Sequence, residues 1–127
     1  MRDLIFRGKA KNNGKWVTSD SILQLPIVGS VELYDEATRD WVDVIPETVG
    51  QYSGLTDKHG VNIFEGDVVE VERNIAYVGV SAERIGLFEV VFNDGCFMKQ
   101  GKQGLFHFIP SDVCTIVGNK YDNGELL

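Results

Sequence analysis

The tract from Gln51 to Glu72 restricts the fold of this chain more than any other part, because two glycine turns separate short apolar runs there. In the first turn, Asp57 suits the opening position of a type I turn, and Gly60 supplies the positive φ that returns the chain to a strand. Gly66 has the same task in the second turn. The tract therefore predicts short strands joined by tight turns.

The strand expected after Gly66 alternates apolar and acidic residues. Val69 and Val71 should face the core, since successive side chains of a strand point to opposite sides of the sheet. Glu70 and Glu72 should then face water. Short runs with the same period of two predict further strands at residues 4–7, 16–17, 30–34, 41–45, 87–92, 96–98, 105–109 and 113–117.

The segment Leu87–Met98 carries the strongest local signal for a hairpin, because an NDG turn separates two apolar runs. With Asp-Gly as the two central residues, Phe92 lies opposite Phe97 and Val91 lies opposite Met98. Cross-strand pairs of this apolar kind stabilise a sheet by about 0.2–1 kcal/mol each.

The segments between these strands are less regular. Pro46 ends one strand and suits the start of a single helical turn in PETVG. Residues 77–81 are a candidate strand, and residues 81–85 a loop or short turn. Lys99–Gly104, rich in glycine, lysine and glutamine, is expected to be a loop.

The length and composition agree with a folded globular domain. A chain of 127 residues buries roughly two-thirds of its unfolded surface, so it needs neither disulfide nor metal to fold. No linker or repeat divides the chain, and we expect a single domain over residues 1–127. The predicted class is a mainly β fold, barrel- or sandwich-like, with short strands, glycine-rich turns and at most one or two short helical turns.

Metal and cofactor sites are not expected. The two cysteines and two histidines have no zinc-ligand spacing. Cys96 and Cys114 lie among aromatic and aliphatic neighbours, so we interpret both as buried thiols rather than a disulfide or a ligand pair. His59 lies in a turn, and His107 alternates with two phenylalanines in a strand, so both should be at the surface.

The sequence gives little support for catalytic residues. The carboxylate pairs Glu65/Asp67 and Glu70/Glu72 could form an acid–base site, because residues two apart on a strand share a face. Any solvated strand face has the same spacing, and we prefer that interpretation. The chain contains no nucleophile elbow, no glycine pattern for phosphate and no motif around a cysteine–histidine pair. We therefore expect no enzymatic activity.

The formal charge of −7 is unevenly distributed. Residues 1–15 hold five basic residues against Asp3 alone, and they form either a nucleic-acid arm or, as we prefer, the solvated face of a first strand. The stretch Asp20–Glu72 is acidic, which suits either a face for a basic partner or a solubilising surface. Overall acidity disfavours nucleic-acid binding, because neutralised phosphates supply most non-specific affinity.

The remaining surface candidates are aromatic residues that could form a docking platform, although a core position is the preferred interpretation. They are Trp16, Trp41, Tyr34, Tyr52 and Tyr77. No apolar run is long enough to span a bilayer, and the start MRDLIFRGK has neither a sustained apolar segment nor a cleavage site. We therefore expect no membrane segment, no secretory signal and a cytoplasmic location.

Three segments together resemble the YopX family of phage and prophage proteins. They are IPETVGQYSGLTDKHGVNIFEGDVVEV, the closing IVGNKYDNGELL and the opening LIFRGKAKNNGKWV. Departures are slight: Ser53 stands where threonine is usual, and Gly124 where proline is common. The residues that carry the central motif, to which we assign a structural role, are Pro46, Gly50, Gln51, Tyr52, Gly54, Leu55, Asp57, Lys58, Gly60, Ile63, Glu65, Gly66, Asp67 and Val69.

The resemblance implies a small, mainly β protein that is encoded on a mobile element and works in the cytoplasm of a bacterial host. It supplies no catalytic, cofactor-binding or metal-binding residue. The leading hypothesis is a non-enzymatic accessory protein that binds an unknown protein partner or a second copy of itself. The alternatives are an acidic mimic of nucleic acid that inhibits a host DNA-binding enzyme, and a small nucleic-acid-binding barrel that uses Arg2, Arg7, Lys9 and Lys11.

Overall fold

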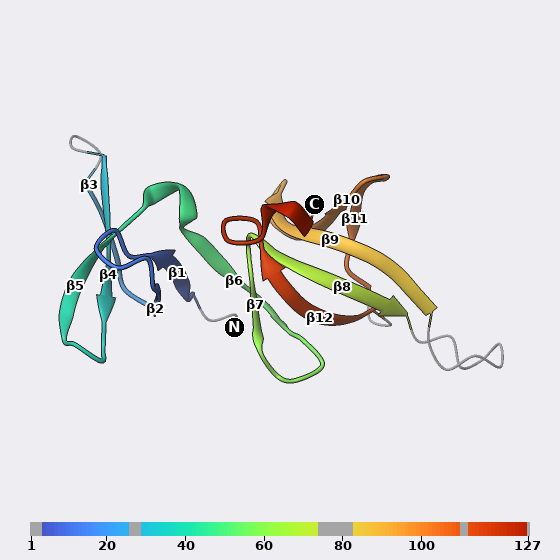
Figure 1. Ribbon diagram of the computed structural model, residues 1–127, viewed down its shortest axis with the longest axis horizontal. Helices are drawn as coiled ribbons and strands as arrows, with labels where there is room; N and C mark the ends of the chain where they lie inside the picture. Colours follow the sequence, from blue (N-terminus) through green and yellow to red (C-terminus); the bar gives the residue numbers. More distant parts are fainter. Residues whose placement is uncertain (1–3, 26–28, 74–82, 110–111, 127) are drawn as a thin grey trace. The chain divides into compact units, whose positions relative to one another are not determined.

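The computed structural model describes residues 4–25, 29–73, 83–109 and 112–126 (Figure 1). These residues form twelve strands and two short 3₁₀ helices, η1 (Pro46–Thr48) and η3 (Gly124–Leu126). The mainly β fold predicted from the sequence is confirmed. Within the described ranges, no helix has the length and apolar character needed to cross a membrane.

The contacts of the chain divide it into two compact units, residues Met1–Tyr52 and Ser53–Leu127. The boundary falls inside strand β6 (Gly50–Thr56), so one continuous strand begins in the first unit and ends in the second. Each unit has buried apolar side chains of its own. The single domain expected over residues 1–127 stays a prediction.

The first unit is built from two small antiparallel groups of strands. In one, β1 pairs with β2 and with the start of β6; in the other, β4 lies between β3 and β5. Leu33 and Val44 are fully buried between them, and Gly8 is required here because a Cβ at that position would lie 3.0 Å from Val44. The strands are β1 (Phe6–Lys9), β2 (Trp16–Ser19), β3 (Ile22–Leu25), β4 (Ser30–Asp35) and β5 (Asp40–Val44).

The second unit contains a five-stranded antiparallel sheet in the order β11-β10-β9-β8-β12. Strand β7 pairs with β6 and is not part of this sheet. Its core is formed by Ile63, Val69, Val71, Phe88, Val90 and Cys114. The strands are β7 (Asn62–Phe64), β8 (Asp67–Arg73), β9 (Glu83–Asn93), β10 (Cys96–Gly101), β11 (Gly104–His107) and β12 (Asp112–Asn119).

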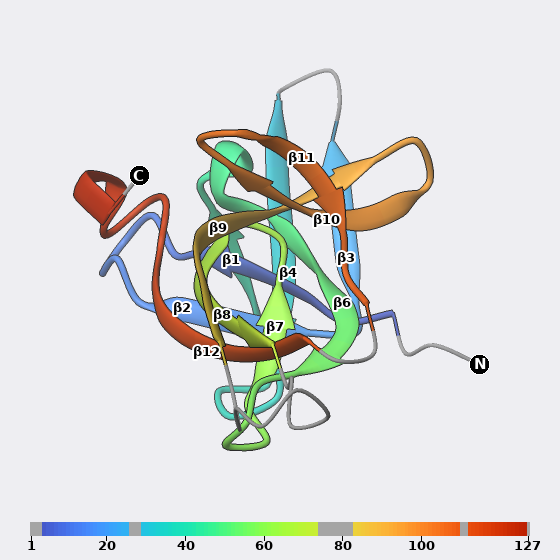
Figure 2. The same ribbon diagram turned by 90° about the vertical axis from the view of Figure 1, so that its right-hand side faces the viewer.

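This sheet curls into a half-barrel (Figure 2). In a flat sheet, its edge strands β11 and β12 would be about 19 Å apart, four strand spacings. Only residues 108–111 join them, and the amide of Asp112 donates back to the carbonyl of Ile109 at 3.0 Å. The short connection therefore requires the two edges to approach each other.

The hairpin predicted at Leu87–Met98 is confirmed in its register. Phe92 lies opposite Phe97, with ring centroids 4.9 Å apart, and Val91 lies opposite Met98. Asp94 and Gly95 have φ values of 50° and 81°, as a type I′ turn requires. The positive φ expected at Gly60 and Gly66 and the helical turn after Pro46 are also confirmed.

Two predictions about local structure are wrong. Lys99–Gly104 is not a loop, because Lys99 continues β10 with its side chain on the inner face of the half-barrel, and Gly104 begins β11. Glu83–Ile85 belongs to β9 rather than to a loop. The candidate strand at residues 77–81 lies outside the described residues.

Several predictions about burial are also wrong. Cys114 is buried as expected, but Cys96 is only half-buried because it lies beside the exposed hairpin turn. Trp41 is 42% exposed, and its ring packs edge-on against Tyr34 at 5.5 Å on the outer face of the three-stranded sheet. Trp16, Tyr34 and Tyr52 are half-buried rather than in the core, and Tyr77 lies outside the described ranges.

Strand β8 is more buried than the alternation of apolar and acidic residues in its sequence predicted. Val69 and Val71 are buried as predicted, but Val68 on the opposite face is buried too. Glu70 and Glu72 are half-buried rather than fully wet. The central position of β8, between β9 and β12, accounts for this difference.

Candidate binding groove in the second unit

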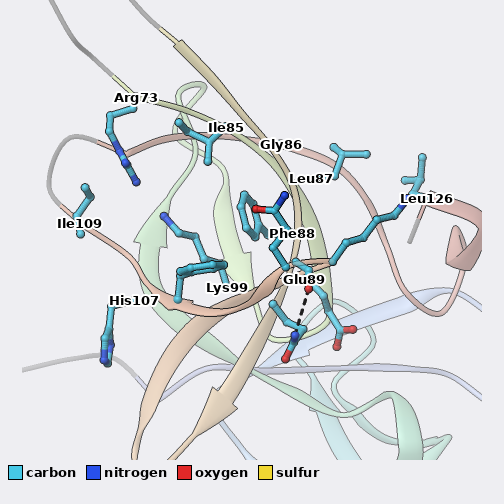
Figure 3. A pocket seen from close by; sticks show the side chains of 15 residues that line it. Arg73, Ile85, Gly86, Leu87, Phe88, Glu89, Lys99, His107, Ile109 and Leu126 are labelled. Carbon is cyan, nitrogen blue, oxygen red and sulfur yellow. Dashed lines mark hydrogen bonds between the residues drawn. The ribbon is translucent and has the colours of Figure 1, made fainter.

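A groove of about 960 Å³ opens over the β9, β10 and β11 side of the half-barrel. Its apolar lining comes from Ile85, Leu87, Phe88, Phe106, Ile109 and Leu126. Phe88 and Lys99 lie near its centre in Figure 3, with Arg73, Ile109 and His107 on one side and Leu87 and Leu126 on the other. The volume and lining are typical of a binding pocket.

Lys99 forms the floor of this groove. Its side chain is only 2% exposed, and its ammonium group bonds to the carboxylate of Asp112. The Nζ atom also lies 5.6 Å from the ring centroids of Phe88 and of Phe108, where the aromatic faces attract a cation. A buried cation is tolerated here because it has a charged partner and two aromatic neighbours.

Both carboxylate oxygens of Asp112 accept hydrogen bonds. Besides Lys99, it accepts hydrogen bonds from Nε and Nη2 of Arg73, at 3.3 and 3.2 Å, and from the amide of Ile109 at 3.0 Å. Burial acts to raise the pKa of Asp112, but the bonds from Lys99, Ile109 and Arg73 outweigh burial and hold that pKa below its usual range. The carboxylate is therefore ionised and committed to structure.

Aromatic packing shapes the wall of the groove. The ring of Phe88 covers Gly101 so closely that a Cβ built there would lie 2.7 Å from Cε1 of the ring. Phe106 meets Phe88 edge-on, with centroids 6.3 Å apart. Phe106 is nevertheless 44% exposed and Ile109 40% exposed, so the groove presents apolar surface to solvent.

The first turn, at residues 57–60, bonds to β12, the other edge strand of the half-barrel. Asp57 is buried; one carboxylate oxygen accepts bonds from the amides of His59 and Val61 at 2.9 and 3.0 Å, and the other from Ile116 of β12 at 3.3 Å. Burial acts to raise the pKa of Asp57, but these bonds and the charge of His59 outweigh it and lower that pKa. The amide of Lys58 also donates to the carbonyl of Cys114 at 2.9 Å.

The closing segment of the chain packs on the second turn. A Cβ at Gly66 would lie 2.9 Å from Cε2 of Tyr121, and the amide of Lys120 donates to the Gly66 carbonyl at 2.9 Å. Asn119 supports this arrangement, because its side-chain oxygen accepts the amides of Tyr121 and Asp122. The central and closing sequence motifs thus meet in space.

The family model described as YopX protein matches residues 5–127, nearly the whole chain. The chain belongs to the YopX family. A search of curated proteins returned no match.

The motif residues of this YopX chain lie along one continuous path. Pro46 begins η1, and Gly50, Gln51, Tyr52, Gly54 and Leu55 lie in β6. Asp57, Lys58 and Gly60 form the first turn, Ile63 lies in β7, Glu65 and Gly66 form the second turn, and Asp67 and Val69 lie in β8. Ser53, the departure from the family pattern, is buried and donates to the carbonyl of Ile63 at 2.7 Å.

The candidate catalytic carboxylates Glu65 and Asp67 of the YopX chain differ in burial. Asp67 is buried and accepts a hydrogen bond from the amide of Phe64 at 2.8 Å, whereas Glu65 is half-buried in the turn.

Burial, followed by the charge of Asp112, raises the pKa of the Cys114 thiol to about 11, so this thiol is protonated at neutral pH. His107 is exposed, as predicted, and lines the groove.

Sequence reasoning missed the residues that build the groove: Phe88, Lys99, Gly101, Phe106 and Asp112. One signal was available, because a strand extended past Met98 places Lys99 on the same face as Phe97. Two of the basic residues near the N-terminus have partners within the first unit. Arg7 lies 4.7 Å from the ring centroid of Trp16, and Lys11 pairs with Asp43 at 3.6 Å.

Proposed function

We propose that this YopX chain is a non-enzymatic binding module, whose groove in the second unit receives a segment of a protein partner or of a second copy. The observation that carries the proposal is the exposed apolar lining, Phe106 and Ile109, at the mouth of a groove of about 960 Å³. The largest contiguous apolar patch on a monomeric protein is often a binding site.

Binding is favoured over catalysis by the state of the reactive groups. The carboxylate of Asp112 is held by Lys99, Arg73 and a backbone amide, and it has no proton to exchange near neutral pH. The raised pKa of Cys114 opposes a nucleophilic thiolate. From the family resemblance, we also propose that the protein is a phage or prophage accessory protein in the cytoplasm of a bacterial host.

Affinity capture from lysogenic cells tests this proposal with two matched variants. Phe106→Ser removes an exposed ring inside the groove, and Val61→Ser removes an apolar side chain that is 53% exposed outside it. We expect one protein to be retained by the unmodified chain and by Val61→Ser, and lost with Phe106→Ser. Sedimentation of the same variants tests self-association. Identical capture and identical mass for all three proteins would contradict the proposal.

A second candidate function, the acidic mimic, is favoured by one feature of the first unit. Glu32 lies opposite Asp43, and Asp35 lies opposite Asp40, on neighbouring strands. Like charges in directly opposed positions destabilise a sheet, so their presence favours a surface kept acidic for binding. Neutralising Asp35, Glu36, Asp40 and Asp43 together should abolish competition with DNA for a host enzyme; unchanged competition would exclude this candidate.

The third candidate, nucleic-acid binding through the basic N-terminal residues, has less support. Arg7 is stacked near Trp16, and Lys11 is paired with Asp43. A binding constant for DNA that falls steeply as salt rises would favour it, and one independent of salt would exclude it.

A further inference from the structure

Strand β11 is the open edge of the half-barrel. It pairs with β10 from Met98↔His107 to Gly101↔Gly104, and within the described ranges no strand pairs with its other side. The opposite edge, β12, is covered by the turn at residues 57–60. The amide of Lys58 donates to the carbonyl of Cys114, and the amide of Ile116 donates to the carboxylate of Asp57. An open edge offers backbone donors and acceptors to an added strand.

The face of β11 that adjoins this edge is apolar and belongs to the groove. Phe106 lies opposite Lys99 in the register and meets Phe88, so its ring is on the inner side. A peptide strand added beside β11 would send every second side chain to this side. Apolar side chains at those positions would cover the exposed surface of Phe106 and Ile109.

The groove has a positive net charge, whereas the whole chain has a negative one. Two cations, Lys99 and Arg73, share the single carboxylate of Asp112, which leaves positive charge there. The acidic lining residue Glu89 is paired with Lys120 at 3.3 Å. Lys102 is exposed and has no ion pair with any residue that the structure describes.

We propose that the occupant is an extended peptide segment that pairs with the edge of β11 and carries an acidic side chain to Lys102, in the turn before β11. This inference rests on the proposed function and names its partner chemistry. Because the formal charge of the chain is −7, an acidic segment is repelled by the chain as a whole, and the exposed ammonium group of Lys102 attracts it locally at the groove. Alternate apolar residues of the segment fill the space along Phe106.

Selection of short random linear peptides on the intact protein tests the inference. We expect the selected peptides to be enriched in Asp or Glu, with apolar residues at alternate positions. Lys102→Glu should weaken their binding about tenfold, since an attraction becomes a repulsion of similar size. Lys58→Glu, which changes an exposed cation outside the groove, should leave their affinity unchanged.

Methylation of the peptide backbone tests the added strand. N-methyl groups at alternate positions should abolish binding, and those at the positions between should not, because only alternate amides donate to β11. Selected peptides that lose affinity with Phe106→Ser but show neither acidic enrichment nor sensitivity to Lys102→Glu would overturn this inference and leave the proposed function standing. Peptides insensitive to Phe106→Ser, or no selected peptide, would count against both.

Discussion

The ammonium group of Lys99 on β10 bonds to the carboxylate of Asp112 at the start of β12, although two strands of the sheet, β9 and β8, lie between them. In a flat sheet, β10 and β12 are about 14 Å apart, farther than the two side chains reach together. The ion pair therefore depends on the curl of the half-barrel and closes its inner side.

Loss of this ion pair should destabilise the fold strongly. Lys99→Met should lower the free energy of unfolding by about 3 kcal/mol, the lower end for a broken buried pair, because Arg73 still bonds to Asp112. Urea denaturation measures the loss. The exposed pair of Lys11 and Asp43 is the control, and Lys11→Met should cost about 0–1 kcal/mol. Equal losses for the two variants would show that burial of Lys99 has no role in stability.

Stability should fall in acid because Asp57 and Asp112 both have a lowered pKa in the folded chain. A carboxyl that is more acidic when folded contributes its full stabilisation above its unfolded pKa, about 3.9, and loses it as the pH falls through the lower folded value. The urea concentration at the unfolding midpoint, measured at decreasing pH from pH 7, should therefore begin to fall near pH 4.

The variant Asp112→Asn separates this effect from general acid denaturation. It should be less stable than the natural chain at pH 7, with a shallower decline in acid, because one of the two groups no longer takes up a proton. Asp94→Asn, in the exposed hairpin turn, is the control for loss of one charge. If Asp112→Asn and the natural chain declined in parallel, the assigned bonds of Asp112 would be wrong.

The two turn glycines should respond differently to alanine. Both have positive φ, +80° at Gly60 and +93° at Gly66, so each substitution costs about 1–2 kcal/mol of backbone strain. A Cβ at Gly60 meets nothing within 4 Å, whereas one at Gly66 lies 2.9 Å from Tyr121. Gly66→Ala should therefore lose about 1–3 kcal/mol more than Gly60→Ala. Thermal unfolding with equal losses would contradict the docking of Tyr121 on this turn.

The two thiols should differ in reactivity. Cys96 is half-buried, while Cys114 is buried and its pKa is raised to about 11, so its thiolate is scarce at neutral pH. Titration of the folded protein with a thiol reagent should show one fast group, and Cys96→Ser should remove it. Two equally fast groups, or a fast group that persists in Cys96→Ser, would place Cys114 at the surface.

Local features of the fold were predictable from the sequence. The hairpin at Leu87–Met98 and the turns at Gly60 and Gly66 depend on residues close together in the chain, and their backbone angles follow from glycine chemistry. The burial of Lys99 was not predictable in this way, because its partner lies on a strand that approaches only after the sheet has curled.

The groove and the second role of Gly66 were missed for the same physical reason. The cover of Gly101 by Phe88 and the packing of Tyr121 on Gly66 are contacts between distant segments. A glycine that leaves room for a neighbour and a glycine that permits a turn have the same appearance in one sequence. Half-buried aromatic residues are equally ambiguous, which is why the expected core positions of Trp16 and Trp41 were wrong.

Amide hydrogen exchange of the full chain, with and without the captured partner, tests the binding groove most directly. We expect slower exchange on binding at β11 (Gly104–His107) and at the adjoining residues 101–103, with little change in β3, β4 and β5. Slower exchange confined to β3–β5 of the first unit, with none at β11, would contradict it.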